Sequence, residues 1–240
     1  MLARLKKVDR RTGLALGLVG GAFVALVIGV TGIALSLGDS GVVLPDEGSL
    51  NDIAGQATAA TTPEPQVAGP PPLAPTRLAI PSLYLDAPVI ALGLTAGNQP
   101  DVPKRPDQVA WYPTFSAPPG QPSNSVLTGH VDWQTPDGAP IPGVFYRLRE
   151  MRIGELIEVT LEDGSTLQYR VKANVATEYN DPKIVDVMQL GNRDVLTVIT
   201  CGGSWVKDNR QPNGGNYSHR VIVRAERVHS LAENVEDSGG

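Results

Sequence analysis

The pattern of hydrophobic and polar residues changes character along the chain. Residues 14–37 form an uncharged run of 24 residues, built almost wholly from Leu, Val, Ala, Ile, Gly and Phe. About 20 such residues suffice for a helix to cross a bilayer, and a helix satisfies its own backbone hydrogen bonds there. Beyond residue 76 the apolar residues come in short stretches, which is typical of β-strands. The pattern predicts one transmembrane helix followed by a β-rich domain.

Eight strands are expected in the β-rich part. They are 78–80, 83–85, 89–92, 125–131, 156–161, 167–176, 195–201 and 220–228. Pro81 and Pro88 interrupt the first three, which suits strand starts or edges. The sequence Glu-Asp-Gly-Ser at 162–165 predicts a hairpin turn. With short helices expected at 143–151 and 182–190, this succession predicts a mainly all-β fold, either a barrel or a sandwich.

Charge and composition predict how the chain is divided. Basic residues are concentrated in 1–13 and acidic residues follow the apolar run, so the positive-inside rule places the N-terminus in the cytoplasm and the rest outside. A cleaved signal peptide is the alternative, although its apolar core is normally about 7–15 residues. Residues 38–75 are rich in Pro, which predicts an extended extracellular linker that lifts the domain off the membrane. The folded domain is expected over 76–230, with a disordered tail over 231–240.

Several classes of function are disfavoured by the sequence. The net charge of −5 gives no basic face for nucleic acid, so none is expected as a partner. The sequence contains no P-loop, HExxH, GxSxG or CxxC motif, so the chemistries that depend on them lack support. No acidic cluster suggests a Ca²⁺ site. The expected cofactors and metals are therefore none.

Cys201 is the one thiol in the chain and stands at the end of the strand expected at 195–201. A single exported cysteine cannot form an intrachain disulfide, which makes it a candidate reactive group. Its alternative role is that of a small buried hydrophobic residue. Three histidines could supply an acid or base: His130, at the end of another expected strand, His219 and His229.

Two charged groups near these candidates also need an interpretation. Arg220 opens the last expected strand and could stabilise an oxyanion, with Arg210 in a glycine-rich loop as its rival. Asp132 follows His130 closely. We expect it to be an exposed carboxylate rather than the third member of a triad.

The sequence Thr-Gly-His at 128–130 and the sequence Thr-Val-Ile-Thr-Cys at 197–201, followed by Arg220, resemble the sortase family. Sortases are membrane-anchored cysteine transpeptidases of Gram-positive bacteria. The resemblance covers roughly 77–228. The Trp-Tyr pair at 111–112 and the two glycines after the cysteine are most similar to actinobacterial members of class F or class E.

The resemblance implies an eight-stranded sortase-type β-barrel, which the periodicity alone does not specify. It implies that Cys201 is the nucleophile, His130 the proton donor and Arg220 the oxyanion stabiliser. Thr200 would contact substrate. The implied reaction cleaves an LPXTG-like sorting signal through a thioester and transfers the acyl group to an amine of a peptidoglycan precursor or a protein, which anchors proteins at the cell surface. The alternatives are a membrane-tethered cysteine endopeptidase and an inert peptide-binding module.

Overall fold

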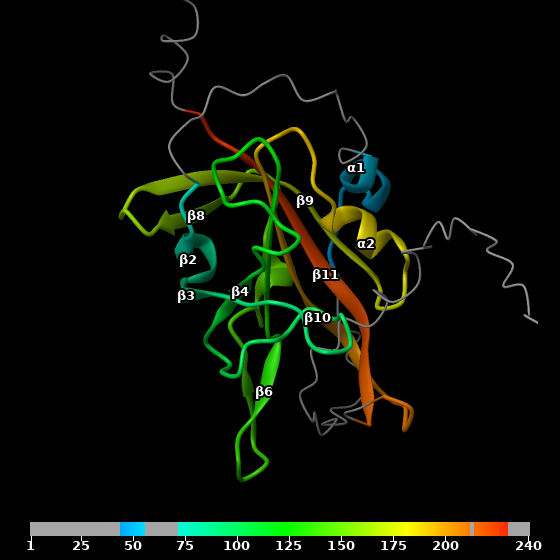
Figure 1. Cartoon of the computed structure of the whole chain (residues 1–240). Helices are drawn as coiled ribbons and strands as arrows, with labels where there is room; N and C mark the ends of the chain where they lie inside the picture. The colour runs from blue at the N-terminus through cyan, green and yellow to red at the C-terminus, as the bar shows by residue number, and fades with distance from the viewer. Residues whose placement is uncertain (1–43, 56–71, 212–213, 230–240) are drawn as a thin grey trace, which may run out of the picture.

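Residues 44–55, 72–211 and 214–229 are described by the computed structural model (Figure 1). Their main sheet closes on itself, because the strand order β9-β11-β10-β5-β4-β3-β2-β8 returns from β8 to β9. The eight strands of this barrel are β2 (Pro75–Ile80), β3 (Leu85–Ala91), β4 (Val109–Trp111), β5 (Asn124–Gly129), β8 (Leu156–Leu161), β9 (Thr166–Glu178), β10 (Val195–Lys207) and β11 (Gly215–Arg227). The predicted eight-stranded all-β barrel is confirmed.

Smaller elements decorate the barrel. A separate hairpin projects from its lower end in Figure 1, and β1 is added to the sheet beside β9. These strands are β1 (Asp46–Glu47), β6 (Asp132–Gln134) and β7 (Pro140–Pro142). The helices are α1 (Leu50–Gly55) and α2 (Lys183–Met188), with 3₁₀ turns η1 (Pro81–Leu83) and η2 (Leu148–Glu150).

The first eight residues of β10 are buried on both faces, which explains why they are mostly apolar. Leu196 and Val198 belong to the larger hydrophobic cluster, which draws residues from strands all around the barrel. Ile199 and Cys201 point the other way and join a second cluster with residues of α1 and α2. Alternation along a strand places Cys201 on the same face as Ile199.

The first strands differ from the prediction. The strand expected at 83–85 is wrong, because Pro81–Leu83 forms η1 and Tyr84 adopts a left-handed conformation with φ of 52°. Strand β4 was not predicted, since its three residues are too few to show a period. The expected helices shrink to η2 and α2, whereas the predicted turn at 162–165 does join β8 to β9.

The hairpin formed by β10 and β11 is longer than predicted. Cys201 and Arg220 were expected at a strand end and a strand start, but both lie inside strands. Pairing continues outward past a bulge between Gly202 and Trp205, as far as Lys207 opposite Gly215. Gly203 has a φ of 76°, a conformation that glycine adopts readily.

Part of the segment expected as a linker is packed on the barrel. Residues 44–55, which we call the strap, contribute β1 and α1, and Ile53 is buried in the second cluster. The predicted transmembrane helix at 14–37 and the predicted tail at 231–240 lie outside the described residues. Within the described residues, no helix is both long enough and apolar enough to span a membrane.

Candidate active site

The strand register brings three of the candidate residues to one place. Cys201 and Arg220 are direct partners across the antiparallel pair of β10 and β11, so their side chains lie side by side on one face. Strands β5 and β10 run parallel with Ile199 opposite Thr128, and both strands continue from there toward His130 and Cys201. The Thr200 hydroxyl donates a hydrogen bond of 2.9 Å to the carbonyl oxygen of Gly129, which ties the two strand ends together.

His130 follows β5 directly and is 1% exposed. Its Nε2 lies 2.7 Å from the carbonyl oxygen of Pro103. A carbonyl only accepts hydrogen bonds, so Nε2 carries a proton. Nδ1 is buried and has no hydrogen-bond partner among the described residues. Nδ1 is therefore the ring atom that can exchange a proton.

The backbone around His130 is fixed by the segment that follows the β6–β7 hairpin. The amide of Phe145 donates to the carbonyl of His130 at 2.9 Å, and the amide of Gly143 donates to that of Val131 at 3.0 Å. A methyl group placed on Gly143 would overlap the His130 carbonyl and lie 2.9 Å from its Cβ. The close approach requires glycine.

The guanidinium of Arg220 is fully buried and oriented by its own strand. It donates to the carbonyl oxygen of His219 at 2.9 Å and to the side-chain oxygen of Asn216 at 3.0 Å. Its central carbon lies 5.9 Å from the centre of the Tyr179 ring, a cation–π distance. These contacts hold a planar cation beside the thiol.

The thiol is closed off from solvent. Cys201 is 1% exposed and borders a cavity of only about 10 Å³. Leu44 from the strap, Tyr146 and Arg149 are among the other residues that line this cavity. Leu44 thus covers the thiol from a part of the chain far away in sequence.

Burial sets the charge state of the pair. It raises the pKa of the Cys201 thiol above its ordinary value, although the positive charge of Arg220 opposes the shift. Burial lowers the pKa of His130, while the Pro103 carbonyl and the charge of Asp132 oppose the shift. The neutral thiol and neutral imidazole are therefore the favoured resting forms at neutral pH.

The prediction of an exposed Asp132 is wrong. The residue is half-buried, and its Oδ2 accepts a hydrogen bond from the hydroxyl of Tyr217. Burial raises the pKa of Asp132, against the Tyr217 bond and the charge of His130, which both lower it. Tyr217 belongs to β11 and was not singled out from the sequence. The two residues are 85 positions apart, so no local pattern could have joined them.

The rival candidates lie elsewhere. Arg210 is exposed and pairs with Asp208 through contacts of 2.9 and 3.2 Å. His219 is opposite Gly202, and its Nδ1 is 2.8 Å from the hydroxyl of Ser218. His229 is exposed just after β11. The structure thus gathers the residues that the family resemblance indicated.

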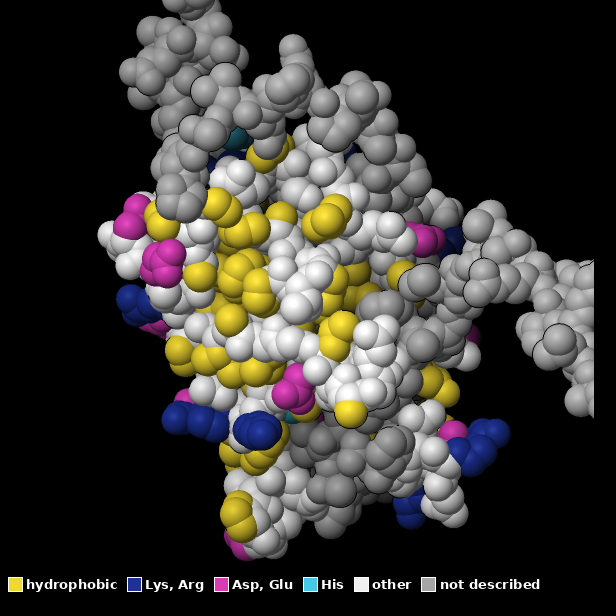
Figure 2. Space-filling model, in the orientation of Figure 1, with side chains coloured by type: hydrophobic (Ala, Val, Ile, Leu, Met, Phe, Trp, Pro, Cys, Tyr) yellow, Lys and Arg dark blue, Asp and Glu magenta, His cyan; other side chains and the backbone are white. Residues whose placement is uncertain are grey.

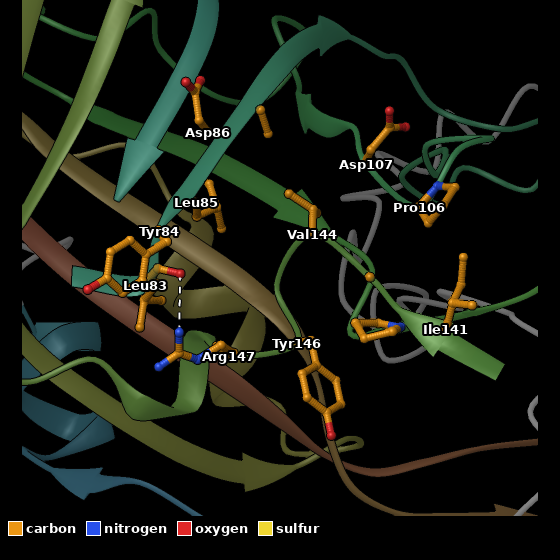
Figure 3. Close-up of a pocket in the computed structure, with 13 residues that line it drawn as sticks. Leu83, Tyr84, Leu85, Asp86, Pro106, Asp107, Ile141, Val144, Tyr146 and Arg147 are labelled. Carbon is orange, nitrogen blue, oxygen red and sulfur yellow. Dashed lines mark hydrogen bonds between the residues drawn. The ribbon is translucent and has the colours of Figure 1, made fainter. Parts of the chain in front are cut away.

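A second, larger cavity of about 700 Å³ is lined in part by the residues that follow the β6–β7 hairpin. In Figure 3, Tyr84 and Arg147 stand on one side of it, and Ile141 and Asp107 on the other. Tyr146 lines both this cavity and that of the thiol. Hydrophobic side chains are also frequent on the molecular face of Figure 2, with charged groups mostly at its margins. Among the described residues, no group of three or more His, Cys, Asp or Glu could hold a metal ion.

Comparison with known proteins identifies the family. The model described as a sortase domain matches residues 78–228, well over half of the chain, so the chain belongs to the sortase family. Members of this family are cysteine transpeptidases. No curated protein shows significant similarity to the chain.

Several solved structures are similar to this chain. Sortase C-1 from Actinomyces oris shares 26% identity over 64% of this chain and 73% of its own, with a TM-score of 0.47. Sortase A from Corynebacterium diphtheriae shares 26% identity over 69% of this chain and 65% of its own, with a TM-score of 0.44. A lid mutant of the latter shares 22% identity, covers 78% and 96% of the two chains, and has a TM-score of 0.47.

Proposed function

We propose that this protein is a cysteine transpeptidase that cleaves an LPXTG-like sorting signal and passes the acyl group to an amine. One observation carries the proposal: in a sortase barrel Cys201 pairs with Arg220, the β5 strand that His130 follows runs beside the strand of Cys201, and all three residues are buried. A thiol with a proton carrier and a fixed cation suits acyl transfer through a covalent intermediate. The acceptor is an amine of a peptidoglycan precursor or of a protein.

In the first half-reaction the Cys201 thiol passes its proton to His130 Nδ1, and the resulting thiolate attacks the backbone carbonyl carbon of the threonine in the signal. A carbon–sulfur bond forms, and Arg220 stabilises the negative oxygen. The carbon–nitrogen bond then breaks while His130 Nδ1 gives its proton to the leaving amine. Nδ1 has this role because Nε2 is held by the Pro103 carbonyl. In the second half-reaction the incoming amine loses a proton to His130 and displaces the thiolate. The hydroxyl of Thr200 fixes the strand end where the substrate backbone is bound.

The cellular setting is part of the same proposal. Residues 14–37 cross the cell membrane once, with the basic tail in the cytoplasm and the catalytic domain outside. The Trp-Tyr pair at 111–112 and the glycines after Cys201 favour membership of class F or class E. Exported proteins that carry the signal would be the substrates.

The test uses the full chain in detergent with sorting-motif peptides, in the presence and absence of an added amine, read by mass spectrometry. We expect an amide product with the amine and a transient thioester on Cys201. Cys201→Ala should abolish both while His219→Ala preserves them. Hydrolysis that the amine does not divert would instead indicate an endopeptidase, and binding without cleavage would indicate an inert module.

A further inference from the structure

Asp132 and Tyr217 join the bases of two hairpins that project from the same end of the barrel. Asp132 opens β6, and Tyr217 lies on β11, three residues before Arg220 (Figure 1). Tyr217 also packs edge-on against Trp205, with ring centres 5.3 Å apart. On the other side, the ring of His130 packs edge-on against Trp133, the residue after Asp132, at 4.9 Å. The contact therefore links the His130 segment to the strand that carries Arg220.

The hydrogen bond has a defined direction. Burial and the adjacent carboxylate both raise the pKa of Tyr217, so the phenol keeps its proton and acts as the donor. Asp132 Oδ2 accepts this hydrogen bond. Its other oxygen, Oδ1, is buried and has no hydrogen-bond partner among the described residues. A buried polar atom without a partner needs an explanation, since leaving it unpaired costs free energy.

His130 also has a buried atom without a hydrogen-bond partner among the described residues. Nδ1 of His130 is buried without a partner among the described residues, just as Asp132 Oδ1 is. In the neutral ring Nδ1 has no proton, because Nε2 carries it. Protonation of His130 creates a new donor and a positive charge in a site where a buried carboxylate oxygen lacks a donor. The imidazolium and the carboxylate carry opposite charges, so Asp132 stabilises the protonated ring.

The charge of Asp132 acts on both reacting groups. It raises the pKa of His130 and also that of the Cys201 thiol. Arg220 acts on the thiol in the opposite direction. The titratable groups around Asp132 are His130 after β5, Cys201 on β10 and Tyr217 on β11, while its partner on β7 is the uncharged Pro142.

We infer that Asp132, held by the hydroxyl of Tyr217, is a positioning residue that stabilises the protonated form of His130 from the formation of the thiolate until the leaving amine takes the proton. The inference rests on the proposed function for its role in turnover. Its electrostatic part concerns only the thiol and the imidazole. It can therefore be measured without any sorting signal.

The experiment compares the full wild-type chain with Asp132→Asn and Tyr217→Phe. Asp137→Asn is the matched control, because Asp137 is an exposed carboxylate on the same hairpin. Two profiles are recorded against pH: the rate of Cys201 alkylation by iodoacetamide, and kcat and KM for transpeptidation. Circular dichroism and thermal melting check that each variant is folded.

Removing the negative charge lowers the pKa of both neighbours. Asp132→Asn should therefore move the alkylation midpoint and both limbs of the kcat/KM profile toward acid, by about half a pH unit or more. It should lower kcat several-fold with little change in KM. Tyr217→Phe should shift the profiles in the same direction by less, and should add nothing in the Asp132→Asn background. Asp137→Asn should leave all profiles unchanged.

Unchanged profiles in a folded Asp132→Asn, or a shift toward alkali, would overturn the inference. If Asp132→Asn does not fold, Tyr217→Phe decides by the same criterion. A wild-type chain without transpeptidation would refute the proposed function. The alkylation profiles would still decide whether Asp132 controls the charge of the site.

Discussion

At the scale of single residues, each candidate catalytic group has its reactive atom selected by a neighbour. The Pro103 carbonyl accepts a hydrogen bond from Nε2–H of His130, so that Nδ1 remains available for proton transfer. Asn216 and the carbonyl of His219 orient the guanidinium of Arg220 beside Cys201. The geometry of the site therefore depends on backbone acceptors and an amide that no catalytic motif contains.

The planar geometry of Arg220 should matter as much as its charge. Arg220→Lys keeps a cation but replaces a rigid fork of donors by a single flexible ammonium group. Losing one oxyanion donor typically costs on the order of 100- to 1,000-fold in turnover, and we expect Arg220→Lys to fall in that range. Arg210→Ala is the control, since Arg210 is exposed. Steady-state kinetics measure the turnover of both variants. Normal turnover for Arg220→Lys together with a large loss of turnover for Arg210→Ala would assign oxyanion stabilisation to Arg210.

The pH dependence of kcat/KM follows from the pKa shifts of Cys201 and His130. The active form needs a thiolate and an imidazolium, so the profile should be a bell with its limbs at the two pKa values. Burial lowers the pKa of His130 and raises that of Cys201, so the acid limb should lie below about 6.5 and the alkaline limb above about 8.5. Rates measured over acidic to alkaline pH test this directly. An acid limb above the ordinary histidine value would contradict the assignment.

At the scale of elements, the segment after the β6–β7 hairpin acts as a brace for His130. Gly143→Ala should push the His130 carbonyl away, because a methyl group has no room there. Overpacking typically costs about 1–3 kcal/mol of unfolding free energy. A misplacement of about 1 Å in a catalytic group can lower turnover on the order of 100-fold. Gly93→Ala is the control, since nothing lies within 4 Å of the added methyl position. Thermal melts and kinetics that are equal for both variants would show that the brace has no role.

The strap covers the thiol through a single side chain. Leu44→Ala should open the cavity beside Cys201 and speed its alkylation several-fold at fixed pH. Stability should change little, because α1 and β1 keep the rest of the strap in place. Leu190→Ala is the matched control, because Leu190 is 55% exposed and does not line the thiol cavity. If alkylation of the two variants proceeds at the same rate, Leu44 does not control access to the thiol.

Local sequence patterns were sufficient for part of this architecture. The apolar run at 195–201, the alternation at 167–176 and the turn at 162–165 predicted strands that the structure contains. Contacts between distant segments carry no such pattern. The three-residue strand β4 is fixed by its neighbours β3 and β5, and the strap is held by pairing with β9. The three site residues were found because motifs mark them.

At the scale of the whole molecule, the strap changes where the active site sits relative to the predicted anchor. Seven residue steps separate residue 37 from Leu44, and a chain extends at most about 3.6 Å per step. Leu44 should therefore lie within about 25 Å of the end of the predicted span. A free linker over 38–75 could instead have lifted the domain on the order of 100 Å. Since Leu44 lines the thiol cavity, the site should be held near the membrane surface.

Förster resonance energy transfer from a dye on the protein to labelled lipid headgroups in nanodiscs tests whether the active site lies near the membrane surface. In a Cys201→Ala background, Ser204→Cys puts a donor dye three residues from the site, and Ser165→Cys puts one on the turn at the opposite end of the barrel. Both serines are exposed. We expect stronger transfer from position 204 than from position 165. A Gly/Ser insertion of about 20 residues after Val43 adds a root-mean-square span of about 25 Å and should weaken the transfer from position 204. Equal transfer from both positions, unaffected by the insertion, would show that the catalytic end does not face the membrane.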